Sequence, residues 1–313
     1  MNRTYNVELD DFADIFGIPI DQIPPRSRTI IQNNNFSYHK VSANEHTQII
    51  KEIEQRISSN GFSVAGNKLK PLWEENWSDQ LKKFIASGLV ISGLTPEYFP
   101  KQTCRLNRDF VKPVDGNFEF NLSQAFKYWI FEYFGCVDSI YEFGCGTCMN
   151  IPILAELFPD KKLHGLDWVS ASKNICTLLA QKYDWDLTGH VFDMSRPNRN
   201  FKVANNSGFL AFSALEQIGT NFKAFIDFAI QKRVAIFVTV DVIEELYDRK
   251  HPLDRLALRY IRKRNYLRKY LTYLKRLEAS GKVEIINLQR VCCGSRYNDG
   301  YSYVIWRPTL TLT

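Results

Sequence analysis

Residues 141–150 read YEFGCGTCMN, and this stretch decides the fold. Cys145 and Cys148 have the C-x-x-C spacing of a thiol redox pair or of half a zinc site. Gly144 and Gly146 form a G-x-G directly after an apolar run, as in loops that bind nucleotides. The two interpretations imply different chemistries, and the residues around this stretch distinguish them.

The redox or metal interpretation is the weaker one. About a third of the chain precedes this stretch, which is unusual for a thioredoxin-like domain. A structural zinc ion needs four ligands, and the other neighbouring pair, Cys292 and Cys293, has no spacer between its thiols. We therefore expect no metal here and interpret the C-x-x-C spacing as a coincidence.

The nucleotide interpretation gains support from the acids that follow later strands. A strand that runs into Gly-x-Gly lets the backbone turn sharply and approach a ligand closely. Asp167 closes the next predicted strand, where a carboxylate can bind both hydroxyls of a ribose. Met149 stands where a dinucleotide site would have a third glycine, so NAD or FAD fits poorly.

Three predicted strands in succession end in acids, namely Glu142, Asp167 and Asp193. Asp193 could bond the exocyclic amine of a purine while Met194 covers its face. Any one of these acids could merely cap a helix, but three in register favour a nucleoside with a cationic tail. S-adenosylmethionine is such a ligand, with Glu142 facing its amino-acid end.

Strands and helices alternate from residue 135 onward, which predicts a parallel, doubly wound sheet. The predicted strands cover 139–143, 162–167, 187–192, 208–213, 234–240, 282–291 and 301–306, and the predicted helices cover 150–158, 171–183, 222–231 and 252–279. No helix separates the last two strands, so one of them should run antiparallel.

The segment from Glu142 to Cys148 resembles the first motif of class I S-adenosylmethionine-dependent methyltransferases, acid-x-Gly-x-Gly-x-Gly, with Cys148 in place of the third glycine. Asp167, Asp193-Met194 and residues 212–218 stand where the later motifs of that family fall. The resemblance covers about residues 135–310. It implies a Rossmann-like α/β fold with a seven-stranded, mostly parallel sheet of order 3-2-1-4-5-7-6, in which strand 7 is antiparallel. It also implies S-adenosyl-L-methionine as cofactor, bound by Glu142, Gly144, Cys145, Gly146, Asp167, Trp168, Asp193, Met194, Ser213 and Leu215.

Residues 1–134 form a separate, aromatic-rich region before this domain of residues 135–313. Isoleucines at 49, 50, 53 and 57 have helical spacing, and we expect a mainly helical extension. Aromatic side chains in such a layer mostly pack, but some could line a pocket for an organic substrate. The extension is therefore expected to serve as part of a lid over the methyl acceptor.

The segment 281–308 is similar to bacterial sugar O-methyltransferases from surface-polysaccharide loci. This narrower resemblance implies methylation of a sugar or glycoconjugate oxygen, on an acceptor that could carry a phosphate. Two alternatives stay open: N-methylation of a small metabolite or peptide, and a basic RNA-binding module with a nucleotide-fold core. Residues 213–216 lack the Pro-Pro motif of DNA amino-methyltransferases, and no Pro-Cys nucleophile occurs, so specific DNA binding is not expected.

An alcohol acceptor benefits from a general base. The candidates near the fourth and fifth strand ends are Glu216 and His251. Asp241, Glu244 and Glu245 are further acids in this region. His164 and His190 lie inside strand patterns and are expected to be structural.

The net charge of +6 comes from one segment. Residues 248–282 hold twelve Lys or Arg against three Asp or Glu, so the rest of the chain sums to −3. We expect an amphipathic helix at 252–279 with a solvated basic face. Its Arg262-Lys-Arg264 cluster could alternatively dock an anionic phosphate or a membrane surface, and Arg296 and Tyr297 could reach the acceptor.

No apolar run approaches the roughly 20 residues of a membrane helix. The first residues lack the apolar segment of a secretory signal, and the seven cysteines are an odd number. We expect a cytoplasmic protein with reduced thiols.

Overall fold

Seven strands form the main sheet, and a computed structural model describes residues 3–59, 62–95 and 103–309. The strands are β5 (Ser139–Phe143), β6 (Lys162–Asp167), β7 (Leu187–Val191), β8 (Ser207–Phe212), β9 (Ile236–Val240), β10 (Val283–Gln289) and β12 (Tyr303–Pro308). Their order across the sheet is β10-β12-β9-β8-β5-β6-β7. β12 is antiparallel to β9 and β10, and the other pairs are parallel. Numbered along the chain, the strands run 3-2-1-4-5-7-6 with the seventh antiparallel, as expected.

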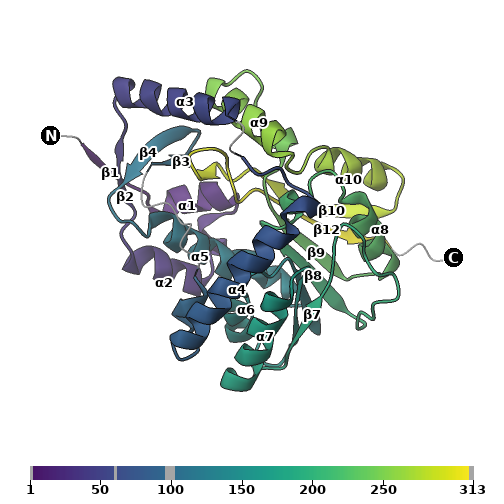
Figure 1. Ribbon diagram of the computed structural model, residues 1–313. Helices are drawn as coiled ribbons and strands as arrows, with labels where there is room; N and C mark the ends of the chain where they lie inside the picture. Colours follow the sequence, from purple (N-terminus) through teal and green to yellow (C-terminus); the bar gives the residue numbers. More distant parts are fainter. Residues whose placement is uncertain (1–2, 60–61, 96–102, 310–313) are drawn as a thin grey trace.

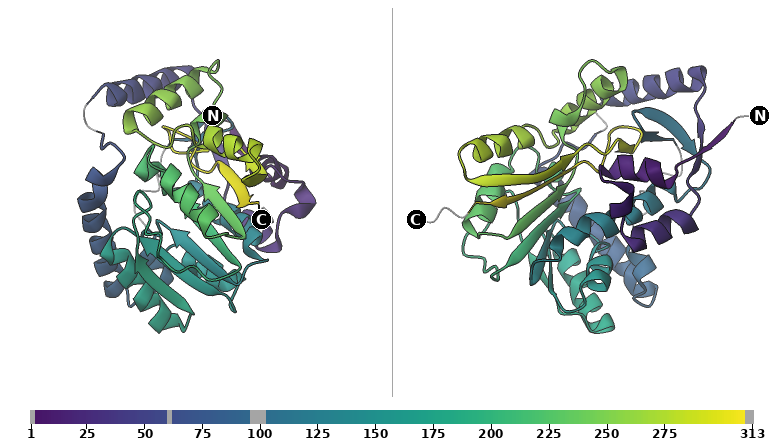
Figure 2. Two further views of the ribbon diagram at one scale, coloured as in Figure 1. Left: turned by 90° about the vertical axis from the view of Figure 1, so that its right-hand side faces the viewer. Right: turned by 180° about the vertical axis from the view of Figure 1, so that it is seen from behind.

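The inner strands β5, β8 and β9 of this sheet are buried on both faces, whereas the edge strands β7 and β10 are partly exposed. Ile140 packs in one hydrophobic cluster with α5 (Phe118–Ile130), α6 (Ile151–Leu157) and α7 (Ser170–Tyr183). Its neighbour Tyr141 belongs to a second cluster with α8 (Lys223–Gln231) and α10 (Tyr270–Ala279). Successive side chains of a strand point to opposite faces, so the result is a sheet between two helical layers (Figure 2). The carboxyl ends of the parallel strands meet at one edge.

The predicted single helix over residues 252–279 is wrong, because the chain forms two helices there. α9 (Pro252–Arg264) ends at Asn265, whose φ of 54° is left-handed, and α10 begins at Tyr270. Asparagine tolerates this conformation better than most residues, and the Asn265 amide caps α9 by donating to the Arg262 carbonyl at 3.1 Å. The break turns the end of α9 toward the carboxyl edge of the main sheet.

The N-terminal region contains helices, as expected, and also a sheet that the sequence analysis lacked. The helices are α1 (Leu9–Phe16), α2 (Pro25–Asn33), α3 (Ala43–Ser58), α4 (Lys70–Ala86) and α5. The strands are β1 (Thr4–Asn6), β2 (Ser37–Lys40), β3 (Cys104–Leu106) and β4 (Asp109–Pro113), joined by β11 (Cys293–Gly294) in the order β1-β2-β4-β3-β11. Because β11 comes from the loop between β10 and β12, this second sheet ties the two regions together. The predicted boundary at residue 134 stays a prediction.

Two N-terminal helices lie over the carboxyl edge of the main sheet. Figure 1 shows α4 crossing α7, and α3 beside α9. α3 starts with a capping box in which Ser42 and Glu45 satisfy each other's backbone amides. Short 3₁₀ helices span Ile20–Gln22, Asn67–Leu69, Ile91–Leu94, Phe131–Phe134, Leu215–Ile218 and Glu244–Leu246. Within the described ranges, no helix is long and apolar enough to cross a membrane.

Candidate functional site

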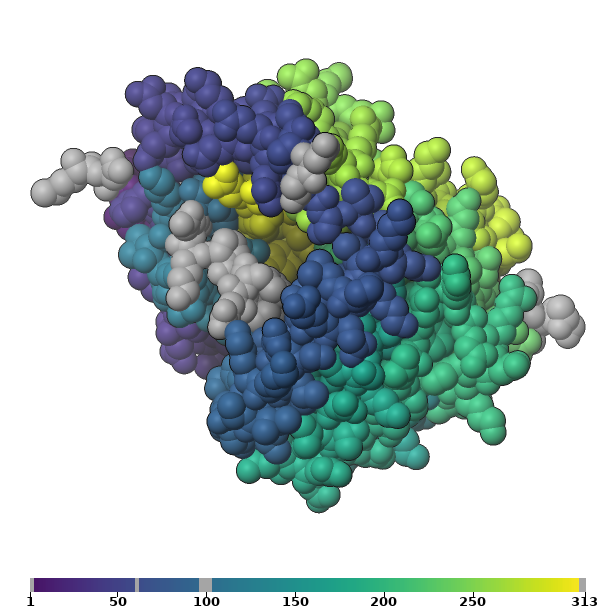
Figure 3. Space-filling model, viewed as in Figure 1, coloured from purple at the N-terminus to yellow at the C-terminus, as the bar shows by residue number. Residues whose placement is uncertain are grey.

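A cavity of about 610 Å³ lies where β5, β6, β8 and β9 end, with α4 and α5 as further walls. Its lining includes the turn after β5, side chains of the N-terminal region and residues of the loop between β10 and β12. In the space-filling view the surface is hollowed between α3 and α4, and C-terminal residues (yellow) are visible inside the hollow (Figure 3). Such a position at the carboxyl ends of parallel strands is usual for ligand sites in this class of sheet.

The glycine turn forms one wall, and its shape requires glycine. Gly144 and Gly146 have φ of 73° and 53°, in the left-handed region. A Cβ on Gly144 would lie 2.4 Å from the Cβ of Ala214, and one on Gly146 would lie 3.2 Å from the Trp77 ring. Gly144, Cys145 and Gly146 all line the cavity, where the sequence analysis placed them.

Glu142 lies at the base of this turn and has one oxygen without a partner. Asn150 Nδ2 donates to its Oε1 at 2.6 Å, whereas its Oε2 is buried and makes no hydrogen bond. Burial raises the pKa of Glu142 to about 8, and it lowers the pKa of the nearby Lys127 to about 8. Lys127 comes from α5, and its ammonium lies 5.2 Å from the centre of the Phe212 ring. A ligand with one positive and one negative group would offset the cost of burying both side chains, because each would then face an opposite charge.

Asp167, at the end of β6, connects the second strand to the turn. Its Oδ2 accepts a hydrogen bond from the Gly146 amide at 2.9 Å, and its Oδ1 accepts one from the Val169 amide at 3.2 Å. Burial raises the pKa of Asp167 to about 6 although these amides oppose the rise. The carboxylate lines the cavity beside Trp168 and still has lone pairs available for a ligand.

The third strand contributes differently from the prediction. Met194 and Phe192 line the cavity, but Asp193 between them does not. The Asp193 carboxylate instead accepts hydrogen bonds from the amide of Ser195 at 2.8 Å and from its hydroxyl at 2.6 Å. Both bonds end on Oδ1, and the predicted contact of Asp193 with an adenine amine stays a prediction.

The segment after β8 brings Ser213 and Glu216 to the cavity. Leu215, also predicted as a cofactor residue, is fully buried in the hydrophobic cluster below and does not line the cavity. This part of the chain is a 3₁₀ helix, in which neighbouring side chains point in different directions. The backbone of Leu215 could still face a ligand, but its side chain is a core residue.

Glu216 pairs with a second buried acid. Asp241, at the end of β9, accepts hydrogen bonds from the amides of Glu216 at 3.2 Å and of Val242 at 2.9 Å. Burial raises the pKa of Glu216 well above its usual range, and Asp241 adds to the rise while Arg264 opposes it. Burial also raises the pKa of Asp241 to about 6. A carboxyl with a raised pKa can act as a proton acceptor near neutral pH.

His251 does not line the cavity. It is the N-cap residue of α9, and its Nδ1 lies 3.9 Å from Oδ1 of Asp254. Its predicted role as a base therefore stays a prediction. Glu244 and Glu245 also lie outside the cavity lining. His164 and His190 contact each other at 3.2 Å between β6 and β7, consistent with structural roles.

Several lining residues were not anticipated. They include Trp73, Trp77, Glu119, Ser123, Lys127, Tyr260, Arg264, Tyr266 and Tyr301. Glu119, Ser123 and Lys127 recur every four residues on α5, so they share one face of an otherwise apolar helix. That spacing was visible in the sequence. Burial raises the pKa of Glu119 to about 7, and Tyr301 donates a hydrogen bond to it at 3.2 Å.

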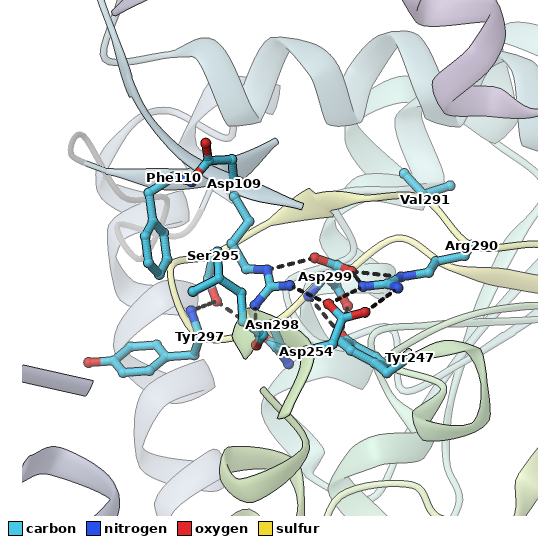
Figure 4. A network of polar contacts seen from close by, with 12 residues as sticks. Asp109, Phe110, Tyr247, Asp254, Arg290, Val291, Ser295, Tyr297, Asn298 and Asp299 are labelled. Carbon is cyan, nitrogen blue, oxygen red and sulfur yellow. Dashed lines mark hydrogen bonds and ion pairs between the residues drawn. The ribbon is translucent and has the colours of Figure 1, made fainter. Parts of the chain in front are cut away.

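An ion network fixes the loop that carries Tyr297 into the cavity wall. Arg105 of β3 donates to Asp299 at 2.9 Å and to Asp254 at 3.0 Å. Arg290 donates to the same two carboxylates at 2.6–3.1 Å, and it lies over the ring of Tyr247. Figure 4 shows Arg290 between Asp254 and Asp299, with the Tyr297 side chain pointing away from them. These four charged groups balance, so the network holds the loop without needing a ligand.

The C-x-x-C spacing has a third member that the sequence analysis missed. The sulfurs of Cys145, Cys148 and Cys176 lie within 4.8 Å of one another, and all three residues are buried. Cys176 comes from α7 and packs over Gly165 of β6, where a Cβ would lie 2.4 Å from its sulfur. Three thiols could bind a soft metal ion, and the expectation of no metal stays a prediction.

Solved structures of low sequence identity share this fold. The crystal structure of the [4+2]-cyclase SpnF has 12% identity and a TM-score of 0.50, over 80% of this chain and 99% of that chain. A geranyl diphosphate methyltransferase in complex with GPP and sinefungin has 11% identity and a TM-score of 0.50, over 78% of this chain and 100% of that chain. The fold is that of class I methyltransferases. No protein-family model and no curated protein matches the sequence.

Proposed function

We propose that this protein is a cytoplasmic S-adenosylmethionine-dependent methyltransferase that methylates an oxygen of a sugar or glycoconjugate. The observation that carries the proposal is the buried Glu142 oxygen without a partner, beside Lys127 and below the glycine turn. Buried polar atoms in native proteins are nearly always satisfied, so an orphaned carboxylate oxygen on a cavity wall indicates a missing ligand group. The shared fold with a methyltransferase supports the same ligand class.

The residues around the glycine turn fit the chemical parts of this cofactor. Glu142 would accept from the ammonium of the amino-acid end, and Lys127 would bind its carboxylate. Asp167 would accept from the ribose hydroxyls, while Trp168 and Met194 would contact the adenine. When bound, S-adenosylmethionine supplies an electrophilic methyl group on a sulfonium.

The other half of the cavity suits a sugar acceptor. Tyr260, Tyr266 and Tyr297 offer aromatic faces, and Ser295 and Asn298 offer a hydroxyl and an amide. A sugar ring presents C–H groups on its faces and hydroxyls around its rim, so a site of aromatic walls with a few polar groups complements it.

Glu216 is the residue proposed to accept the proton of the acceptor hydroxyl. It lines the cavity, its amide is held by Asp241, and its raised pKa makes it a stronger base than an exposed carboxylate. The rest of the protein's task is positioning and exclusion of water. Trp73 and Trp77 of α4, which stack with ring centres 5.1 Å apart, form part of the cavity wall.

Calorimetry with S-adenosylhomocysteine tests the cofactor, and transfer of a labelled methyl group to a panel of sugars, amines and peptides tests the acceptor. Binding of the cofactor product and label on a sugar oxygen are expected. Label on nitrogen would favour N-methylation, and no binding of S-adenosylmethionine or its product would refute the proposal. The RNA-binding alternative predicts that generic RNA shifts in a gel at low salt, because phosphate contacts would dominate.

A further inference from the structure

Two cations face the cavity, and they lie in different halves of it. Of the lysines and arginines in the described ranges, Lys127 and Arg264 are the ones that line it. Lys127 is fully buried beside Glu142, at the end of the cavity assigned above to the cofactor. Arg264 is half-buried beside Tyr260 and Tyr266, on the side assigned to the acceptor.

Aromatic rings hold the Arg264 guanidinium, and no carboxylate of the described residues lies within ion-pair distance of it. Its central carbon is 4.9 Å from the ring centre of Tyr266, 5.7 Å from that of Phe62 and 5.9 Å from that of Tyr260. Its Nε is buried and makes no hydrogen bond. Stacking leaves the edge of a guanidinium free, and this edge carries the donors that bind oxyanions in pairs.

Neighbouring arginines of the same surface are occupied by acids. Arg259 donates to Glu54 at 2.7 Å, Arg296 donates to Glu52 at 2.7 Å, and Arg262 lies 3.9 Å from Glu244. Glu216 lines the same cavity, and the charge of Arg264 opposes the rise of its pKa, but no ion pair joins these two side chains in the described structure. Arg264 therefore stands out as the cation whose charge is left for a ligand.

The backbone around Arg264 is fixed. Its carbonyl accepts from the Ala65 amide at 2.8 Å, and the side chain of the next residue, Asn265, donates to the Ala65 carbonyl at 3.1 Å. Gly66 in turn donates to the Gln217 carbonyl at 2.8 Å. These bonds clamp the end of α9 between the N-terminal region and the segment that carries Glu216. A cation held in place loses little freedom when it binds a ligand.

We propose that Arg264, together with Tyr297 of the same cavity lining, forms a subsite for an oxyanion on the acceptor, so that the substrate is a sugar carrying a phosphate or a carboxylate. This inference rests on the proposed function, because it takes the Tyr260 side of the cavity as the acceptor half. Tyr297 stacks on Tyr260 at 4.8 Å and sits on the loop fixed by the ion network (Figure 4). Phosphate and carboxylate share the planar, two-oxygen contact that a guanidinium binds.

Calorimetry on protein saturated with S-adenosylhomocysteine tests this subsite. The probes are glucose, glucose 6-phosphate, glucuronate and inorganic phosphate, which separate the sugar from its charge and phosphate from carboxylate. Wild-type protein should bind one of the charged sugars about 10- to 100-fold more tightly than glucose, as expected for a charge-assisted hydrogen-bond pair. The phosphate and carboxylate probes then identify which anion the site prefers.

Three variants assign the effect to Arg264. Arg264→Met should abolish the preference for the charged sugar, Arg264→Lys should keep part of it, and the matched control Arg262→Met on the same helix should keep all of it. The affinity for S-adenosylhomocysteine should change less than about threefold in each. If Arg264→Met does not fold, a weakened preference in Arg264→Lys decides the question, since lysine keeps the charge but not the paired donors, and an unchanged preference there would count against the subsite.

The inference is overturned if wild-type protein binds glucose as tightly as its charged relatives, or if Arg264→Met retains the preference. These outcomes leave the proposed cofactor untouched. Conversely, a protein that binds none of the cofactor but binds inorganic phosphate through Arg264 would refute the proposed function and keep the anion site.

Discussion

The ion network and the cavity hold charged groups that are almost equally buried, yet their polar atoms are used in opposite ways. In the network, Arg105, Arg290, Asp254 and Asp299 direct their hydrogen bonds at one another. In the cavity, Glu142 and Glu119 each keep one buried oxygen without a partner. Burial of a charge is costly in either place, and only the first group recovers that cost within the folded chain. Charged groups that are paired within the chain stabilise the structure around the site, whereas carboxyl groups with an unpaired buried oxygen are available to bind a ligand.

Removing one member of the network gives the largest expected loss of stability. Arg105→Met leaves two buried aspartates facing a single arginine, so the free energy of unfolding should fall by about 3–5 kcal/mol. Urea denaturation followed by fluorescence measures the change. The control Arg259→Met breaks an exposed pair with Glu54 and should change stability little. If both substitutions lowered the free energy of unfolding equally, the buried network would stabilise the protein no more than an exposed ion pair does.

Glu216→Gln should lower kcat by about 10²- to 10⁴-fold, because the amide keeps the size of the side chain but cannot accept the acceptor's proton. In the wild type, the raised pKa of Glu216 means that kcat should increase as the pH rises through that pKa and the carboxylate forms. The variant should lose this dependence. His251→Ala serves as the control, since His251 lies outside the cavity lining, and a comparable loss there would restore it as the base.

Asp167→Ala should weaken binding of S-adenosylhomocysteine by about 10- to 100-fold, the scale of hydrogen bonds to a charged group. Calorimetry measures the affinity. Asp193→Ala is the matched control, because Asp193 also follows a strand of the main sheet but bonds Ser195 instead of lining the cavity. Near-full affinity in Asp167→Ala would refute its assignment to the ribose, and an equal loss in Asp193→Ala would restore the predicted adenine contact.

The orphaned carboxyl of Glu142 should make the stability of the ligand-free protein depend on pH. Its pKa is about 8 in the folded protein against an ordinary value of 4.5, so its protonated form favours the folded state. That contribution is present below about pH 4.5 and is lost as the pH rises toward 8. Stability measured by urea denaturation across this window should decline less in Glu142→Gln. A parallel decline in both proteins would show that the carboxyl is already satisfied.

The sequence predicted the main sheet well and the second sheet not at all. The strands of the main sheet are five to seven residues long, whereas β1, β3 and β11 are two or three residues long. β11 pairs with β3 from a distant part of the chain, and no local pattern encodes such a pairing. The long helix was mispredicted because its apolar spacing continues across Asn265, where one left-handed residue ends it.

The cofactor half of the site was more predictable than the acceptor half, for the same reason. Glu142, Asp167 and Met194 lie at or just beyond strand ends, and parallel strands bring their carboxyl ends to one edge. Arg264 and Tyr297 reach the cavity only through a helix break and a loop fixed by long-range ion pairs. His251 also follows the fifth strand, but it lies at the start of α9 and does not line the cavity.

The smallest effect on stability and cofactor binding is expected from the thiol cluster of Cys145, Cys148 and Cys176, whose buried sulfurs contact one another. Cys148 and Cys176 are fully buried behind the glycine turn, and the cluster offers three ligands where a structural zinc ion takes four. Dialysis against a chelator should therefore leave the melting temperature and the affinity for S-adenosylhomocysteine unchanged, and Cys176→Ala should cost about 1 kcal/mol or less, as a small core truncation does. Elemental analysis provides the control. The contrary result would be one equivalent of bound zinc or copper whose removal by the chelator also abolishes cofactor binding. The C-x-x-C spacing would then have a chemical role, and a metal ion as well as the glycines would stabilise the turn.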